Sequence, residues 1–422
     1  MQAFKKYTLD NGLRIILAPQ PTSLAATVLV LVEAGSKYET KEINGLSHFL
    51  EHMCFQGTKK RPRQIDIGSE LDSLGAESNA FTAQEYTGYW IKANAKNLEK
   101  SLDIVSDMYL NPVFGLEEID KERGVIIEEL NMYRDTPARH VVDLFMNVLY
   151  GDQPAGWDIG GSKEVINVLK RDDFLKYRDT HYLANSTLVV VAGAFDEAET
   201  LAKIKTYFSD IKTGVKSQKI KTIENQAKPA ALVQFKESDQ SHLVLGARAF
   251  DIFDDRRFAL QVLGDILGGS MSSRLFQKVR TEMGAAYYIS ASSDFFSDHG
   301  FLAVNAGVDH KKIDAVVKAV LEEFIDIKEK GVSPKELRRS KDHLSGSLAL
   351  NFETSDEIAS FYGGQEIIKR EISSLEDLLE KIQSVSAEEI QAVARDIFKN
   401  EKLNLALIGP FKDKNFSDIL KL

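Results

Sequence analysis

Residues 45–53 of this chain of 422 residues read Gly-Leu-Ser-His-Phe-Leu-Glu-His-Met. The spacing of the apolar residues predicts a helix from residue 43 to residue 55. Residues four apart lie on one face of a helix, so the imidazoles of His48 and His52 can reach the same metal ion. Glu51 borders that face, where a carboxylate beside a metal-bound water has the position of a general base. The alternative is a helix with two surface histidines and a nearby acid.

A catalytic zinc site needs three protein ligands and one open position, so a third ligand has to come from another segment. The candidate is a predicted helix over residues 116–133, which read LEEIDKERGVIIEELNMY. Glu122 and Glu129 are seven residues apart in it, which is two helical turns on one face. Spacing alone does not choose Glu129 over Glu122 or Glu128, and an amphipathic helix with a charged exposed side is the alternative. The order HxxEH is the pattern of the inverzincins, a class of zinc peptidases.

Composition narrows the class of protein. With 43% hydrophobic and 27% charged residues the chain is typical of a soluble globular protein. The formal net charge of -10 argues against a general nucleic-acid binder, because phosphate binding needs a positive field. Cys54 is the only cysteine, so no internal disulfide can form, as is usual in a reducing compartment. The sequence has no signal-peptide pattern and no apolar run of membrane-spanning length, and we expect a cytoplasmic protein without a membrane partner.

The length predicts two domains of about 200 residues each. A polar stretch without aromatic residues, 213–229, is the predicted linker between a domain at 1–212 and a domain at 230–422. A predicted strand at 25–32 precedes the predicted helix at 43–55, which carries both histidines and is called the metal helix below. In the second half a predicted strand at 243–247 likewise precedes a predicted helix at 255–267, which lacks metal ligands. Each half also ends with a predicted helix followed by a strand, at residues 177–195 and 394–411. We therefore expect two copies of one α+β unit, with two unrelated α+β domains as the alternative.

Three further β segments are predicted in the first half. Residues 5–9 and 13–18 flank the Asn-Gly pair of a tight turn and predict a hairpin. Residues 80–93 have the threonine, tyrosine and tryptophan content of one strand, and residues 187–192 form another.

The stretch at 45–53, taken with residues 122–129 (ERGVIIEE), resembles the M16 family of metallopeptidases. That family includes pitrilysin, insulin-degrading enzyme and the mitochondrial processing peptidase. Its HxxEH motif is followed, after 76 residues, by a glutamate that binds zinc, and 76 residues separate His52 from Glu129 here. The resemblance implies one Zn²⁺ per chain, held by His48, His52 and Glu129. It also implies that Glu122, which matches a second glutamate of the family, supports this site.

Two other stretches resemble the family. Residues 75–82 (GAESNAFT) are similar to a strand beside the active site, which implies that Asn79 and Ala80 hold a substrate in extended form by β-augmentation. Residues 267–276 (LGGSMSSRLF) and 280–287 (RTEMGAAY) are similar to the C-terminal half, which implies that Arg280 and Tyr287 bind the substrate carbonyl or the oxyanion. Without the resemblance, Asn79 is a turn or strand residue, Arg280 a surface arginine and Tyr287 a strand residue.

The resemblance covers almost the whole chain and implies a fold of two homologous α/β-sandwich halves, each a mixed sheet with packed helices, facing each other like a clamshell. The implied activity is that of a zinc metalloendopeptidase acting on peptides or unfolded polypeptide segments. A homodimer, or a heterodimer with a related subunit, is expected. The alternative function is a non-catalytic subunit that binds peptides or stabilises a partner. Residues 152–160 (DQPAGWDIG) depart from the family pattern, which concerns specificity rather than hydrolysis.

Overall fold

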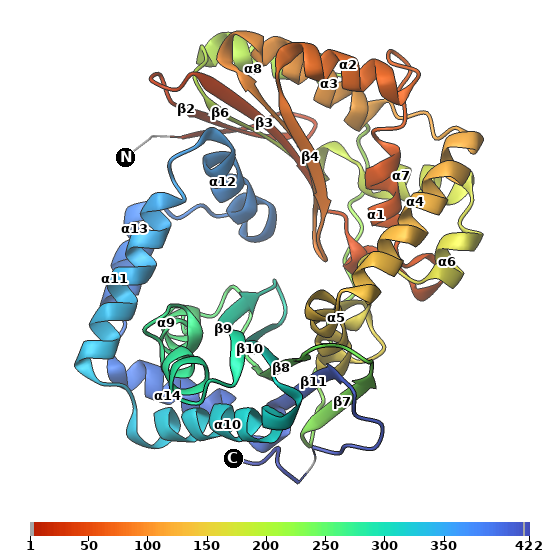
Figure 1. Cartoon of the computed structure of the whole chain (residues 1–422). Coiled ribbons are helices and arrows are strands. Elements are labelled where there is room, and N and C mark those ends of the chain that lie inside the picture. Colours follow the sequence, from red (N-terminus) through yellow and green to blue (C-terminus); the bar gives the residue numbers. More distant parts are fainter. Residues whose placement is uncertain (1–3, 417) are drawn as a thin grey trace. The chain divides into compact units, whose positions relative to one another are not determined.

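The computed structural model describes residues 4–416 and 418–422, and the chain forms two compact units (Figure 1). The first unit runs to Leu130 and then takes in Asp158–Ile220 and Ala349–Ile372. The second consists of Asn131–Trp157, Lys221–Leu348 and the residues from Ser373 onward. Each unit contains one mixed sheet with helices packed on it, as the sequence predicts.

The sheet of the first unit has the strand order β1-β2-β6-β3-β5-β4. β2 and β6 are parallel, and the other neighbouring strands are antiparallel. β4 lies at one edge and pairs with β5 alone among the described strands. The strands are β1 (Lys5–Thr8), β2 (Arg14–Pro19), β3 (Ala25–Val32), β4 (Glu77–Thr82), β5 (Thr87–Asn94) and β6 (Thr187–Gly193).

The sheet of the second unit repeats this topology. Its order is β7-β11-β8-β10-β9, in which β7 and β11 are parallel and the other neighbours are antiparallel. β7, β8, β9, β10 and β11 thus correspond to β2, β3, β4, β5 and β6, which confirms the predicted repeat of one α+β unit. The strands are β7 (Ala230–Phe235), β8 (Ser241–Arg248), β9 (Ala286–Phe295), β10 (Gly300–Val308) and β11 (Leu403–Gly409).

Most helices of each unit cover one face of its sheet and enclose the larger core. In the first unit these are α1 (Leu46–Met53), α2 (Gln64–Leu74), α3 (Leu98–Leu110), α4 (Leu116–Asp135), α6 (Lys163–Val168), α7 (Arg171–His181) and α8 (Glu197–Tyr207). In the second they are α9 (Arg257–Gly268), α10 (Ile313–Lys330), α11 (Pro334–Leu350), α13 (Leu375–Ser384) and α14 (Ala387–Ile397).

One helix covers the opposite face of each sheet, and it comes from the other half of the sequence. α12 (Ser355–Lys369) places Ile358 and Tyr362 against Leu29 and Leu31 of β3 and Val190 of β6. α5 (Pro137–Tyr150) likewise packs Phe145 on the apolar face formed by Val244, Phe301 and Ala406. Because both faces are covered, β3 and β6 are almost continuous apolar runs rather than alternating ones.

The compact units therefore differ from the predicted domains 1–212 and 230–422, because α5 and α12 are exchanged between the halves. The change of unit at Ile220 does fall inside the predicted linker, 213–229. That segment contacts the rest of the first unit. Lys219 forms an ion pair with Glu85 over 2.6 Å, and the Ile220 N–H donates to the Lys37 carbonyl over 2.9 Å.

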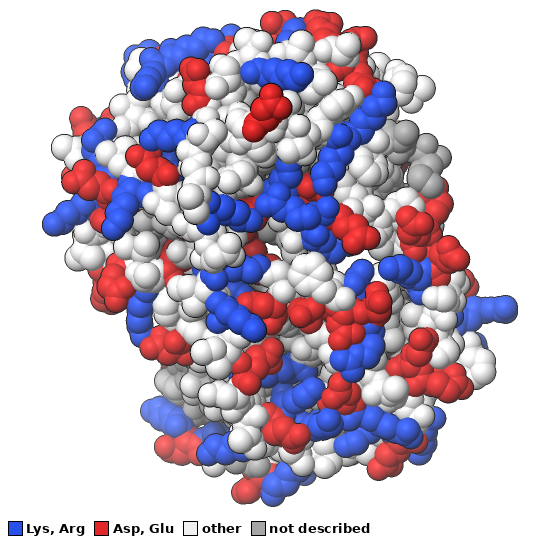
Figure 2. Space-filling view, turned by 180° about the vertical axis from the view of Figure 1, so that it is seen from behind, with Lys and Arg blue, Asp and Glu red and all other residues white. Residues whose placement is uncertain are grey.

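The predicted hairpin and the strands at 25–32 and 187–192 are confirmed. The single strand predicted over residues 80–93 is wrong. Two strands, β4 and β5, occupy this region and are joined by a turn in which the Ala83 N–H donates to the Tyr86 carbonyl. No helix in the described part of the chain is sufficiently long and apolar to cross a bilayer. Acidic and basic side chains are interspersed over the face shown in Figure 2.

Candidate metal centre

The helix that carries the two motif histidines begins at an unusual cap. Gly45 at its N-cap has φ 97°, a left-handed conformation, and a Cβ there would lie 2.6 Å from the Gly160 carbonyl oxygen. The carboxylate of the fully buried Glu39 accepts the N–H of Ser47 over 2.6 Å and that of Gly45 over 2.8 Å. A side chain outside the helix thereby satisfies backbone donors at the N-terminus of α1 and complements its dipole.

Helical spacing brings the two imidazoles together, as predicted. The Nε2 atoms of His48 and His52 are 3.3 Å apart on one face of α1. The opposite face of α1 is buried, with Phe49 packed edge-on against Phe174 of α7 at a ring-centroid distance of 4.9 Å. Packing of that apolar face fixes the rotation of the helix and therefore the direction of both histidines.

The two glutamates that spacing alone could not rank have different places on α4. Glu129 Oε2 lies 3.5 Å from His52 Nε2 and 3.7 Å from His48 Nε2. Glu122 lies behind the pair, where its Oε1 accepts from His52 Nδ1 over 2.8 Å and its Oε2 accepts from Gln56 Nε2 over 2.7 Å. Glu128, the third possibility, is exposed.

The donor set fits zinc by size and by chemistry. Tetrahedral zinc with bonds of about 2.0–2.1 Å places its ligand atoms about 3.3–3.4 Å apart. One ligand atom each from His48, His52 and Glu129 lies within 4.8 Å of the others, and the three separations given above are between 3.3 and 3.7 Å. The hydrogen bond from His52 Nδ1 to Glu122 leaves the Nε2 lone pair free to bind a metal, which is the usual arrangement behind a histidine ligand.

The electrostatics of the two histidines differ. Burial, with a smaller contribution from His52, lowers the pKa of His48 to about 4, so its imidazole is neutral at pH 7. Burial also acts to lower the pKa of His52, but hydrogen bonds to Glu122 and Glu129 outweigh it and raise the pKa to about 9. A metal ion at this position would replace the proton that His52 carries in the metal-free protein.

Glu51 lies on the same helix beside the ligands and is only 8% exposed. Its Oε2 accepts a hydrogen bond of 2.5 Å from Thr82 Oγ1, at the end of β4. Burial raises the pKa of Glu51, while the bond from Thr82 acts in the opposite direction. A buried carboxylate with a raised pKa next to a metal site has the properties of a general base.

The edge strand β4 adjoins α1. Its outward residues Glu77, Asn79 and Phe81 are exposed, whereas Ser78, Ala80 and Thr82 are half-buried. The side chain of Asn79 accepts the N–H of Ala80 over 2.9 Å, and neither residue contacts the three metal ligands through a hydrogen bond in the described chain. The strand itself offers backbone groups on its unpaired side.

Arg280 and Tyr287 lie in the second unit, close to each other. Arg280 belongs to a π-helical segment (Phe276–Glu282), a feature that is frequent at functional sites. Its guanidinium carbon is 5.8 Å from the centre of the Tyr287 ring and 4.9 Å from that of Phe276. Both Arg280 and Tyr287 are exposed, Tyr287 at 73%.

Four residues with roles at this site were not predicted from the sequence: Glu39, Gln56, Thr82 and Gly161. Gln56 follows His52 by four residues, so helical spacing could have suggested it. Gly161 has φ 75°, and a Cβ on it would lie 2.2 Å from the Asn44 carbonyl oxygen at the start of α1. The stretch at 152–160 departs from the family pattern. Its last residue, Gly160, and the following Gly161 pack closely against the start of α1.

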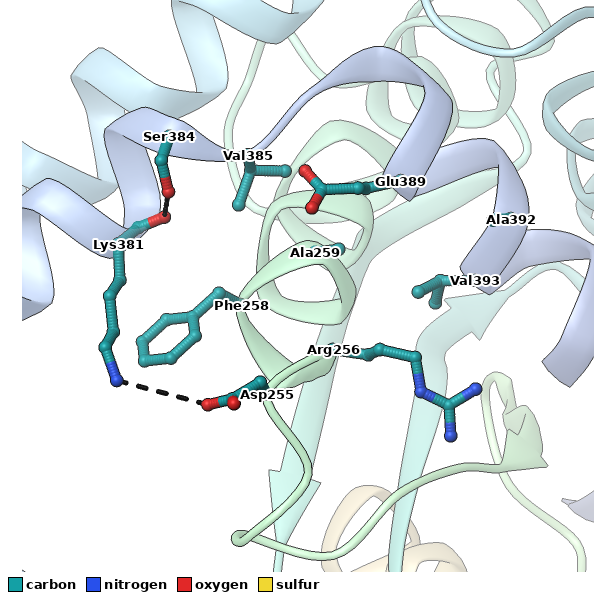
Figure 3. A pocket seen from close by; sticks show the side chains of 10 residues that line it. All are labelled: Asp255, Arg256, Phe258, Ala259, Lys381, Ser384, Val385, Glu389, Ala392 and Val393. Carbon is teal, nitrogen blue, oxygen red and sulfur yellow. Dashed lines mark hydrogen bonds and ion pairs between the residues drawn. The ribbon is translucent and has the colours of Figure 1, made fainter.

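A separate pocket of about 380 Å³ lies in the second unit, between the start of α9 and the connection from α13 to α14 (Figure 3). Its charged groups have partners there. Lys381 lies 4.0 Å from Asp255, and Arg256 pairs with Asp254 over 2.6 Å. Glu389 accepts the N–H of Ser386 over 2.7 Å. Half of its described lining residues are apolar: Phe258, Ala259, Val385, Ala392 and Val393. The described lining residues do not form a catalytic or metal-binding set.

Comparisons with known proteins agree with this fold and identify the family. The family description "Insulinase (Peptidase family M16)" matches residues 14–162, and "Peptidase M16 inactive domain" matches residues 169–344. The uncharacterized zinc protease YmxG of Bacillus subtilis is 33% identical over 406 residues, covering 96% of this chain and 98% of that protein. An uncharacterized zinc protease of Streptomyces coelicolor is 34% identical over 421 residues, covering 98% and 91%.

Solved structures share the fold at lower identity. A protease from Helicobacter pylori superposes with a TM-score of 0.91 at 22% identity, covering 97% of this chain and 100% of that chain. A structure described as a peptidase M16 inactive domain from Pseudomonas fluorescens has a TM-score of 0.89 at 17% identity, covering 98% and 99%. The HxxEH stretch at residues 48–52 lies inside the part of the chain that matches the M16 description. The chain is a member of peptidase family M16.

Proposed function

We propose that this protein is a zinc metalloendopeptidase that hydrolyses peptides or unfolded polypeptide segments. The observation that carries the proposal is the convergence of His48 Nε2, His52 Nε2 and Glu129 Oε2 at the spacing of tetrahedral zinc ligands. The buried carboxylate of Glu51 on the same helix supplies the general base that such a site needs. The names of the relatives, which call them zinc proteases, support the same assignment.

Each residue has a distinct part in the proposed reaction. His48, His52 and Glu129 would hold a zinc ion, which would supply a bound water of lowered pKa and would polarise a carbonyl oxygen. Glu51 accepts the proton of the attacking water and passes it to the leaving amine. Glu122 holds His52 in the tautomer that presents Nε2 to the metal.

Substrate binding is assigned to the edge of β4. A peptide that adds to this edge is held by main-chain hydrogen bonds, which give affinity with little dependence on sequence. The exposed Asn79 and the half-buried Ala80 are the strand residues assigned to the substrate. Arg280 and Tyr287 are assigned to the substrate carbonyl oxygen, since both can donate to developing negative charge. The expected homodimer or heterodimer remains a prediction.

A second candidate function is a non-catalytic subunit that binds peptides or stabilises a partner. The match of residues 169–344 to a domain described as inactive favours it. The counterpart of α1 in the second unit, α9, carries no histidine, so that description fits the second half of the chain. The complete donor set in the first half favours the enzyme.

Metal analysis and peptide cleavage on the purified protein test the proposal. We expect about one zinc per chain and cleavage of an internally quenched peptide that stops on addition of a chelator and returns with Zn²⁺. Glu51→Gln should retain zinc and lose cleavage, because it lacks only the base. A zinc-loaded wild type without turnover on unrelated peptides would favour the non-catalytic subunit.

A further inference from the structure

We propose that Thr82 is a positioning residue, whose hydroxyl holds one carboxylate oxygen of Glu51 so that the other oxygen is presented to the attacking water. The inference rests on the proposed function and assigns that reaction a residue outside the metal-binding helices. Thr82 does not bind the metal and acts only through Glu51.

The contact between the two side chains is short and specific. Thr82 Oγ1 donates to Glu51 Oε2 over 2.5 Å. In the described part of the chain this is the only hydrogen bond made by either carboxylate oxygen of Glu51. A glutamate side chain has three rotatable bonds, so without the hydroxyl its carboxylate has no polar contact that selects one orientation. The single bond to Thr82 therefore decides where Oε1 points.

Thr82 is itself held firmly. It is the last residue of β4 and is paired with Thr87 of β5. The turn that follows is fixed from the segment before α1, since the Lys37 N–H donates to the Gln84 carbonyl over 2.8 Å. Gly35 lies so close to this turn that a Cβ on it would be 2.3 Å from the Ala83 carbonyl oxygen. A hydroxyl on such a backbone can impose its geometry on a flexible partner.

The strand that carries this hydroxyl is also the strand assigned to substrate binding. Thr82 and Ala80 are two residues apart and lie on the same face of β4, while the strand's unpaired edge remains available. A peptide added to this edge and the carboxylate of Glu51 would both be placed by β4. The register between the scissile bond and the base would then be set by one short strand.

Geometry of this kind matters for rate more than for binding. Proton transfer requires the base within about 2.6–3.2 Å of the proton donor. A misplacement of about 1 Å can cost about 100-fold in rate even when the reacting groups are intact. Main-chain contacts along β4 do not involve the hydroxyl, so removal of the hydroxyl should leave substrate affinity almost unchanged.

The test compares wild type with Thr82→Val, which replaces the hydroxyl by a methyl group of similar size, and with Thr82→Ser, which restores it. We expect Thr82→Val to lower kcat by about 10- to 100-fold with little change in KM. Thr82→Ser should recover most of kcat. Zinc content should be the same in all three proteins, and all three should be fully folded at the assay temperature, although Thr82→Val should melt somewhat lower because it leaves a buried carboxylate oxygen without its partner.

A binding measurement gives a readout that does not depend on turnover. A phosphinic peptide has a tetrahedral phosphorus with two oxygens, which resembles the carbonyl carbon after attack by water. A peptide with a reduced, uncleavable bond resembles the bound substrate instead. Thr82→Val should weaken binding of the phosphinic peptide by about 10-fold and leave the reduced peptide unaffected, because only the former contacts Glu51. Thr82→Ser should bind both as wild type does.

The outcomes separate this inference from the proposed function. Unchanged kcat and unchanged phosphinic-peptide affinity in Thr82→Val, with an active wild type, would overturn the role of Thr82 alone. Equal losses in Thr82→Val and Thr82→Ser, accompanied by a rise in KM, would indicate a distorted strand and would also overturn it. If zinc-loaded wild type cleaves nothing, the proposed function fails, and the phosphinic-peptide comparison still decides whether Thr82 orients Glu51.

Discussion

His52 Nδ1 lies 2.8 Å from Glu122 Oε1, on the side of the imidazole ring that faces away from His48 and Glu129. The contact orients the ring and leaves Nε2 for the metal. We expect Glu122→Gln to weaken zinc binding by about 10- to 100-fold, because a neutral amide holds the ring less firmly than a carboxylate. Competition with a chromogenic chelator measures this affinity. Glu128→Gln, an exposed site on the same helix, is the matched control and should bind zinc as wild type does.

Glu39 should matter for the stability of the metal helix although it is not a ligand. Glu39→Gln replaces an acceptor by a donor opposite the N–H of Ser47 or Gly45 and leaves one buried donor unpaired. We expect a loss of about 1–3 kcal/mol in the free energy of unfolding of the metal-free protein, measured by urea titration. Glu42→Gln, on the exposed surface nearby, should have almost no effect. Equal stabilities of the two variants would contradict the capping role.

Arg280 and Tyr287 are predicted to act on the transition state rather than on substrate affinity. Arg280→Ala and Tyr287→Phe should each lower kcat by about 100- to 1000-fold, as the loss of one oxyanion donor does elsewhere. Tyr287→Phe keeps the aromatic ring that Arg280 contacts, so it isolates the hydroxyl. Arg338→Ala, an exposed arginine of α11, is the control. Steady-state kinetics on a quenched peptide would contradict the prediction if only KM changed.

The contact of α12 with the first sheet contains a buried charge network. Arg14, 3% exposed, donates to Glu366 Oε1 over 3.1 Å and to Glu33 Oε1 over 2.6 Å. We expect Glu366→Leu to lower the free energy of unfolding by about 3–5 kcal/mol, because it leaves Arg14 with an incomplete set of buried partners. The double variant Arg14→Met/Glu366→Leu should lose less than the sum of the single losses. Strictly additive losses in urea titrations would rule out this coupling.

Glu336 should contribute stability that depends on pH. Burial acts to raise its pKa, but bonds from Arg274 and Ser333 outweigh it and lower the pKa to about 2. A carboxyl whose folded pKa lies below its unfolded value of about 4.3 stabilises the fold above that value, and the contribution is lost as pH falls toward 2. The difference in unfolding free energy between wild type and Glu336→Gln should therefore shrink from pH 6 to pH 3. A constant difference would contradict the prediction.

The sequence predicts the metal helix well because helical periodicity is local. His48 and His52 are four residues apart, and no tertiary information is needed to place them on one face. The choice of Glu129 over Glu122 and Glu128 is different, since it depends on how α4 packs against α1. Only resemblance to a family could make that choice in advance. The structure then shows why the three acids differ: one faces both imidazoles, one lies behind His52, and one is exposed.

Other features depend on contacts that no local pattern reports. The turn between β4 and β5 reads Ala-Gln-Glu-Tyr, without glycine or proline, so the residues at 80–93 gave no signal of two strands. Glu39 caps α1 from outside the helix, at a distance from the usual cap position. An amphipathic helix indicates that one of its faces must be covered, but not which sheet covers it, and so the exchange of α5 and α12 could not be read from the sequence.

The position of α12 on the first sheet has a consequence for synthesis on the ribosome. Translation produces β3 and β6 long before residue 369, so their apolar face with Leu29, Leu31 and Val190 has no cover while most of the chain is being made. A product truncated in the linker would keep that surface open to water, where it invites aggregation. The N-terminal half can therefore finish folding only after α12, which is made more than 150 residues after β6, has left the ribosome.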